Sequence, residues 1–119
     1  MRPIDIGCTE KSAVYFYTSG ETAKQTFFYP LCVGHYFCTK EYLVQRNNYN
    51  SFLLIYAKKG EGYLKVDGKK YTFRKEDVVL IDCYKPHIYG TVKDSELLWI
   101  HFDGSTSREY AEMIFGNSG

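Results

Sequence analysis

A small group of polar and aromatic side chains has the chemistry of a binding site. His87 follows Pro86, and Tyr89 stands two residues later, so His87 and Tyr89 share one face of a predicted strand. Trp99 offers a flat apolar face, which suits the C–H face of a pyranose ring, and an indole N–H that can donate to a hydroxyl. His101 shares the strand face of Trp99. These residue types favour holding a small polar ring.

Arg46 is a further candidate, because a guanidinium offers up to five donors in a planar fork for hydroxyls or a carboxylate. Each candidate also has an ordinary structural explanation. Arg46 suits a solvated loop, His87 can be satisfied by backbone, and Trp99 can be a core residue beneath a helix. Tyr36 and Tyr56 are additional candidates whose facing the pattern does not fix. The sequence alone leaves these alternatives open.

Histidine spacing argues against a metal centre. A mononuclear site inside a barrel needs an H-x-H pair and a Glu on one motif and a His on a later one. The segment 49–68, where the first motif belongs, contains no histidine, and nothing in the spacing requires His35 and His101 to converge with His87. The chain also has no nucleophile elbow, no glycine-rich phosphate loop and no acid/base carboxylate pair. We expect no metal, no other cofactor and no enzyme activity.

The elements that position these residues read as short strands. Aromatic residues make up 18% of the chain, with twelve Tyr and eight Phe, and such residues favour β structure. Asp67-Gly68 predicts a type I′ hairpin, because both central positions of that turn need positive φ. The predicted strands are Ala13–Tyr17, Thr26–Tyr29, Leu31–Cys38, Tyr42–Gln45, Phe52–Tyr56 (buried on both faces), Gly62–Val66, Lys69–Phe73, Val78–Ile81, His87–Thr91 and Glu96–Phe102.

One helix is expected after the last strand. Thr106 and Glu109 have the spacing of a capping box, and the apolar residues that follow fall on one helical face. Along the last strand Leu97, Trp99 and His101 share one face, which we expect to point inward. The other face is apolar and needs a cover, for which the helix is the nearest candidate. That face comprises Leu98, Ile100 and Phe102.

Composition excludes several classes. The net charge of +1 gives no field for nucleic acid, and the lysine pairs are interleaved with acids. No apolar run is long enough for a transmembrane helix, and Asp5 and Glu10 interrupt any signal peptide. The four cysteines lack C-x-x-C spacing, so we expect them to be reduced core residues of a cytoplasmic protein.

An ordered series of segments resembles the cupin-like N-terminal effector-binding domain of AraC-family transcription regulators. The resemblance covers roughly 31–114, and Arg46 fits a further family feature. It implies an all-β, antiparallel jelly-roll barrel with a C-terminal helix. The implied divisions are an arm or edge segment over 1–30, the barrel over 31–103, and the start of a helical dimerisation segment over 104–119. The matching segments read YAKKGEG, GYLKVDGKKYTF, EDVVLID, CYKPHIYG and LLWIHFDG.

The resemblance also implies a function. The barrel is expected to sense a small-molecule effector, by family a sugar, and to take part in a homodimer. DNA is expected to be read by a helix-turn-helix part that this chain lacks, so the chain is expected to be part of a longer regulator. Tyr89 matches a position at which related sugar-sensing regulators contact ligand, whereas the family gives His101 no fixed role. Two alternatives remain: a small cupin enzyme, such as a sugar isomerase or dioxygenase, and a free-standing carbohydrate-binding module.

One position departs from the family pattern. Glu76 stands where the family usually shows glycine before an aspartate. We expect the turn there to adopt a conformation that tolerates a side chain.

Overall fold

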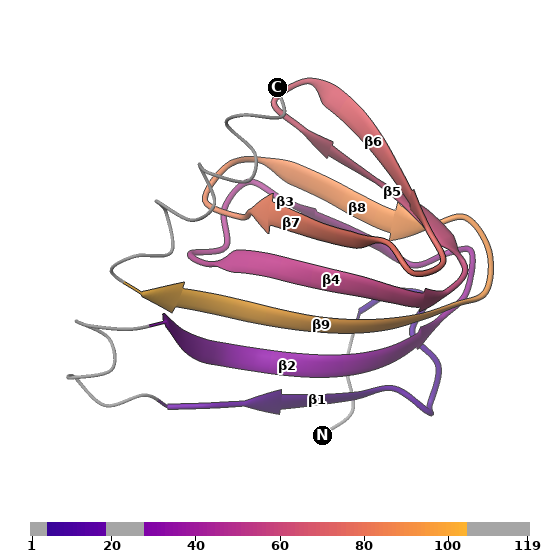
Figure 1. Cartoon of the computed structure of the whole chain (residues 1–119), viewed down its shortest axis with the longest axis horizontal. Helices are drawn as coiled ribbons and strands as arrows, with labels where there is room; N and C mark the ends of the chain where they lie inside the picture. The colour runs from indigo at the N-terminus through magenta and orange to yellow at the C-terminus, as the bar shows by residue number, and fades with distance from the viewer. Residues whose placement is uncertain (1–4, 19–27, 105–119) are drawn as a thin grey trace.

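Nine antiparallel strands make up two sheets in the computed structural model, which describes residues 5–18 and 28–104 (Figure 1). The first sheet has the order β1-β2-β9-β4-β7, and the second has the order β3-β8-β5-β6. The strands are β1 (Ala13–Phe16), β2 (Phe28–Cys38), β3 (Leu43–Arg46), β4 (Phe52–Lys59), β5 (Glu61–Val66), β6 (Lys69–Arg74), β7 (Val78–Asp82), β8 (His87–Thr91) and β9 (Ser95–Gly104).

The all-β antiparallel prediction is confirmed for the described residues. In the first sheet β9 is central, because it pairs with β2 on one side and with β4 on the other. In the second sheet β8 pairs with both β3 and β5. Side chains from both inner faces form one apolar core, which places the two sheets face to face. Its buried members include Val14, Leu53, Ile55, Ile81, Leu97, Val44, Leu64 and Phe73.

The expected closed barrel is wrong. Among the described residues no hydrogen-bonded ladder joins the two sheets, so the fold is an open two-sheet sandwich. The edge strand β6 explains part of this. Five of its six side chains are exposed, and Lys69, Lys70 and Arg74 surround it with charge. A charged, solvated edge disfavours pairing with another strand.

The expected C-terminal helix falls on residues 105–119, which lie outside the described part of the chain. Within the described part, no helix is long and apolar enough to cross a membrane.

Two strand predictions need correction. The chain does not break at Pro30: β2 runs through it, and the pairing of β2 with β9 shifts register between Pro30 and Cys32. A proline lacks the N–H that a ladder needs, so an irregular register at this point is expected. Phe52–Tyr56 is a strand, but it is not buried on both faces, because the outward-facing Leu54 is 37% exposed.

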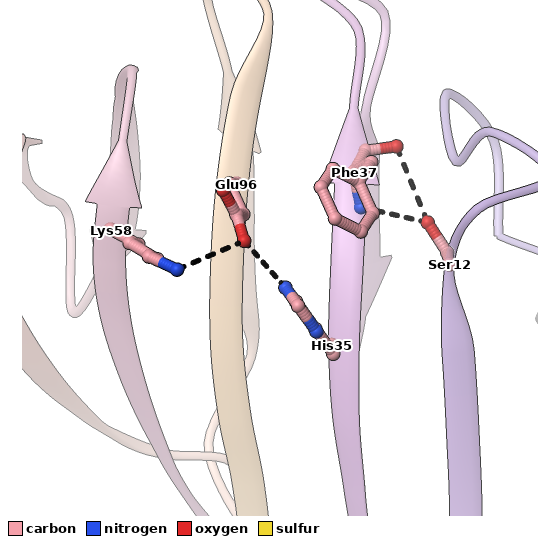
Figure 2. Close-up of polar contacts among 5 residues, drawn as sticks. All are labelled: Ser12, His35, Phe37, Lys58 and Glu96. Atoms are coloured by element: carbon pink, nitrogen blue, oxygen red, sulfur yellow. Dashed lines mark hydrogen bonds and ion pairs between the residues drawn. The ribbon is translucent and has the colours of Figure 1, made fainter.

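Polar side chains cross the outer face of the first sheet near one end (Figure 2). Glu96 of β9 lies between His35 of β2 and Lys58 of β4. Its Oε2 is 2.7 Å from His35 Nε2 and 3.7 Å from Lys58 Nζ. The hydrogen bond from His35, followed by the charge of Lys58, lowers the pKa of Glu96. This network ties three neighbouring strands together on a face that is otherwise largely apolar.

The Asp67-Gly68 hairpin is confirmed. Asp67 has φ 53° and Gly68 has φ 73°, as a type I′ turn requires.

The expectation at Glu76 is wrong, because this residue keeps the left-handed conformation with φ 74°. Asp77 N donates to Arg74 O at 2.9 Å, and Glu76 N donates to Ala57 O at 2.6 Å. A turn with positive φ at its third residue strains any residue that has a β-carbon. The two backbone hydrogen bonds hold Glu76 in that strained conformation.

Replacement of Glu76 by glycine is therefore expected to stabilise the fold. Glycine relieves the left-handed strain but gives the unfolded chain more entropy. The net gain in the free energy of unfolding is expected to be up to about 1 kcal/mol. Urea denaturation measures the change. Glu76→Ala is the control, because it removes the exposed carboxylate and keeps the β-carbon, so little gain is expected. Loss of stability in Glu76→Gly would contradict the assignment.

Candidate functional site

Alternation along β9 points Leu97, Trp99 and His101 into the space between the sheets. Leu97 and His101 are 1% and 3% exposed, whereas Leu98 on the opposite face is 39% exposed. The predicted inward face of this strand is therefore confirmed.

Trp99 lies against the backbone of the neighbouring strand. It pairs with Gly34, and a β-carbon at Gly34 would clash with ring atoms Cε2 and Cζ2 of Trp99. The Trp99 ring also packs edge-on with Tyr36, with ring centroids 5.0 Å apart at 85°. The indole Nε1 is buried without a hydrogen-bond partner among the described residues. The ring is thus held in place by packing while its N–H remains unused.

Arg46 and His87 are directly opposite each other on β3 and β8 of the second sheet. The Arg46 guanidinium lies over the Tyr49 ring, with Cζ 4.4 Å from the centroid. Its Nη1 is buried and has no hydrogen-bond partner within the described residues. Stacking on an aromatic ring stabilises a cation without using its N–H donors. Arg46 therefore retains donor capacity between the sheets.

His87 has one ring nitrogen satisfied and one free. Nδ1 donates to the Lys85 carbonyl at 2.8 Å, so that nitrogen carries the proton. Burial lowers the pKa of His87 despite this hydrogen bond, which keeps the ring neutral near pH 7. Nε2 is then a bare acceptor, and it too is buried without a partner in the described part of the chain. The backbone explanation that the sequence left open for His87 therefore applies to Nδ1, whereas Nε2 remains available as an acceptor.

His101 is engaged by a serine. Its Nδ1 lies 2.8 Å from Ser51 Oγ, and Ser51 Oγ in turn donates to the Tyr49 carbonyl at 3.3 Å. Burial, followed by the charges of Arg46 and His87, lowers the pKa of His101 to about 3. The Trp99 ring packs on His101 at 5.4 Å between centroids. His101 therefore contributes a neutral wall beside the tryptophan.

The sequence did not predict the contact between Asp5 and Tyr36. Asp5 Oδ2 accepts a hydrogen bond from Tyr36 at 3.0 Å, which brings the carboxylate of the N-terminal segment to the aromatic cluster. Burial and the Asp5 charge raise the pKa of Tyr36. Tyr42 packs edge-on against both Tyr36 and Tyr89, with centroids 5.8 and 6.1 Å away. No sequence motif indicates that Asp5 would make this contact. The packing of Trp99 on Gly34 does have a sequence signal, because a glycine within a strand can indicate close approach of another group.

The five predicted residues therefore line one interior. Tyr89 is 4% exposed and stacks on His87 at 6.0 Å between ring centroids. Burial has the largest effect on the pKa of Tyr89 and of His101, and the charge of Arg46 acts to lower both, although the two residues lie on opposite sheets. Tyr56 does not belong, because it pairs with Leu98 on the outer face of the first sheet, whereas its neighbour Ile55 points into the core. The space between the sheets is therefore lined by five of the predicted residues: Arg46, His87, Tyr89, Trp99 and His101.

A surface pocket of about 390 Å³ reaches the edge of this interior. It opens at one end of the second sheet, and Arg46 and His87 form part of its wall. Within residues 5–18 and 28–104, no three His, Cys, Asp or Glu side chains are grouped so as to hold a metal ion.

Comparison with known proteins identifies the family. The family model of the AraC-like ligand binding domain matches residues 29–119. The chain belongs to this family. No curated protein matches the chain.

Solved structures similar to this AraC-like domain share its fold at low sequence identity. KdgF from Halomonas sp. has a TM-score of 0.62 at 10% identity, over 91% of this chain and 88% of that one. A cupin superfamily protein from Desulfitobacterium hafniense has 0.58 at 15%, over 84% and 89%. An HTH_3 family transcriptional regulator from Vibrio cholerae has 0.60 at 9%, over 79% of this chain and 52% of the regulator. The AraC-like domain therefore has a cupin fold.

Gly34→Ala tests the packing of Trp99 in the AraC-like domain. The added β-carbon must displace the indole, so we expect a shift in tryptophan emission and a loss of roughly 1–3 kcal/mol of stability. Trp99 is the only tryptophan, so its emission reports this position alone. Gly68→Ala is the control, since it strains a left-handed turn in open space and should leave emission unchanged. Unchanged emission in Gly34→Ala would contradict the packing.

The buried histidines predict a pH dependence of stability. The pKa of His101 is lowered to about 3 in the folded domain, so the unfolded chain takes up a proton first as the pH falls. Stability should be level above the ordinary histidine pKa and decline below it. Each such histidine adds at most about 1.4 kcal/mol per pH unit.

Urea denaturation between pH 7.5 and 5.0 measures this slope. His101→Gln should show a shallower decline than the parent chain, because it removes one of the titrating groups. Equal stability of the parent chain at pH 7.5 and 5.0 would refute the prediction.

Proposed function

We propose that this domain senses a small hydroxylated molecule, by preference a sugar, for a transcription regulator of the AraC type. The ligand lies between the two sheets and contacts Arg46, His87, Tyr89 and Trp99, with His101 beside the tryptophan. The observation that carries the proposal is a set of three buried nitrogens without partners among the described residues, on Arg46, His87 and Trp99.

The three nitrogens differ in what they require. Arg46 Nη1 and Trp99 Nε1 can only donate, whereas the neutral His87 offers Nε2 as an acceptor. A hydroxyl group both donates and accepts, so a molecule that bears several hydroxyls can satisfy all three. Leaving such groups unpaired in the interior costs about 1–3 kcal/mol each. A polyol therefore recovers free energy that the empty domain lacks.

Charge and shape support the same class of ligand. The interior receives a cation from Arg46 and an anion from Asp5, so it shows no strong preference for a charged ligand. The Trp99 ring supplies an apolar, polarisable face, against which the C–H face of a sugar ring can stack. A neutral, ring-shaped polyol fits these features better than a phosphate or a fatty acid does.

Ligand binding must change something outside the site in order to regulate. A ligand shifts an equilibrium only as far as its affinities for the two states differ. Asp5 of the N-terminal segment accepts a hydrogen bond from Tyr36, and the Tyr36 ring contacts Trp99. A ligand that moves Trp99 can therefore displace Tyr36 and change the position of the N-terminal segment. We infer that the domain forms a homodimer, and that a helix-turn-helix part of a longer protein contacts DNA.

A thermal-shift screen against a panel of neutral sugars tests the function. A true effector raises the melting temperature according to its concentration relative to Kd. Calorimetric titration of that sugar into Trp99→Ala and Arg46→Ala should give affinity about 10- to 100-fold weaker. Arg74→Ala is the matched control, since Arg74 is an exposed arginine on the edge strand β6.

Unchanged affinity in both Trp99→Ala and Arg46→Ala would show the site to be misplaced. Metal analysis of protein purified without chelator addresses the alternative of a small cupin enzyme. Stoichiometric iron, manganese or zinc would favour that enzyme over a sensor.

A further inference from the structure

Cys8 and Cys38 lie opposite each other on two adjacent antiparallel segments of the chain. They form an isolated antiparallel bridge between the N-terminal segment and the end of β2. Hydrogen bonds flank the bridge on both sides: Thr9 N donates to Phe37 O at 2.9 Å, and Thr39 N donates to Gly7 O at 2.8 Å. This pattern makes Cys8 and Cys38 a non-hydrogen-bonded pair, in which the two side chains come closest.

Such a pair is compatible with a disulfide. Opposed residues of this type have Cα atoms about 4.5 Å apart, within the range of about 4.4–6.8 Å that disulfides span. Both cysteines are free thiols in the structure, and a hydrogen bond joins their side chains. Cys32 and Cys83 provide the contrast, because their strand and hydrogen-bond partners include no cysteine.

The surroundings hold the two segments in register. Ser12 Oγ accepts from Phe37 N at 2.8 Å and donates to Phe37 O at 3.3 Å, as Figure 2 shows. At the other end of the segment, Asp5 accepts from Tyr36. The cysteine pair thus lies between two independent anchors, and forming a bond between the sulfurs needs little backbone movement.

We propose that Cys8 and Cys38 are a redox modification site, at which a reversible disulfide fixes the N-terminal segment to β2. The inference is independent of the identity of the effector. It concerns a segment that reaches Trp99 through a short chain of contacts, from Asp5 to Tyr36 to Trp99.

The order of reaction follows from exposure. Cys8 is partly exposed and Cys38 is 3% exposed, so an oxidant reaches Cys8 first. With oxidised glutathione, the Cys8 thiolate attacks one sulfur, the glutathione S–S bond breaks, and one glutathione thiol leaves. The Cys38 thiolate then attacks Cys8 Sγ of the mixed disulfide and releases the second glutathione. Two protein thiols lose two electrons and two protons, which glutathione takes up as two thiols.

The pKa of Cys38 fits this order. The hydrogen bond with Cys8, together with burial, raises it well above its ordinary value, so Cys38 is a poor first nucleophile. Reaction of Cys8 removes the hydrogen-bond partner that contributes most to this shift. Cys38 then becomes more reactive at the step where it is needed.

The test is oxidation of the full chain in glutathione buffers of increasing oxidised fraction. Four thiols should fall to two, with a Cys8–Cys38 cross-link found by peptide mass mapping. Closing a loop of this length should raise the melting temperature by roughly 10 °C, and dithiothreitol should reverse the rise. Cys8→Ser should lose both effects. Cys83→Ser, the matched control at a buried cysteine, should keep both.

A mapped cross-link between any other cysteines would overturn the proposal. So would four thiols that persist in fully oxidised buffer, or a cross-linked chain whose melting temperature is unchanged.

Discussion

The register of β9 is the constraint on which the candidate site depends. This strand pairs on both sides, with β2 and with β4, so its alternation cannot be changed without breaking two ladders. A slip of one residue would turn Leu97 and Trp99 outward and bring Leu98 and Ile100 into the core. The same pairing places Trp99 opposite Gly34, the position without a side chain on which the indole lies. Fixing the sheet therefore also fixes the aromatic wall of the site.

The interior combines a well-packed apolar core with polar groups that lack partners among the described residues. A domain is typically stable by about 5–15 kcal/mol, so three unpaired buried groups at about 1–3 kcal/mol each are a large fraction of that total. Packing from Leu53, Ile55 and Leu97 offsets the cost without satisfying the nitrogens. A domain built this way gains stability when a suitable molecule enters, which is a physical basis for sensing.

Sequence pattern predicted the strands well and the closure of the sheets poorly. Alternation and the Asp-Gly turn are local signals, so β5, β6, β8 and β9 were expected close to their observed bounds. Closure depends on whether distant edges meet. The charged residues of β6 are visible in the sequence, but only the strand order places β6 at an edge of its sheet. Glu76 shows another limit, since its N–H donates to Ala57 O, far away in the sequence, and this bond helps to hold Glu76 in a conformation that its own residue type disfavours. At the site, strand alternation predicted the facing of Trp99 and His101. The contribution of Asp5 depends on a long-range contact with Tyr36.

The strand order of the first sheet also affects how the chain can fold. β2 is made early, yet its long partner β9 is the last strand within the described residues. During synthesis, the edge of β2 that pairs with β9 therefore stays without its partner until β9 has left the ribosome. Contacts this distant along the chain are slow to form, and exposed strand edges invite association with other chains. Until β9 is available, β2 has one unpaired edge at which other chains can associate, and shortening the chain before β9 removes the central strand of the first sheet.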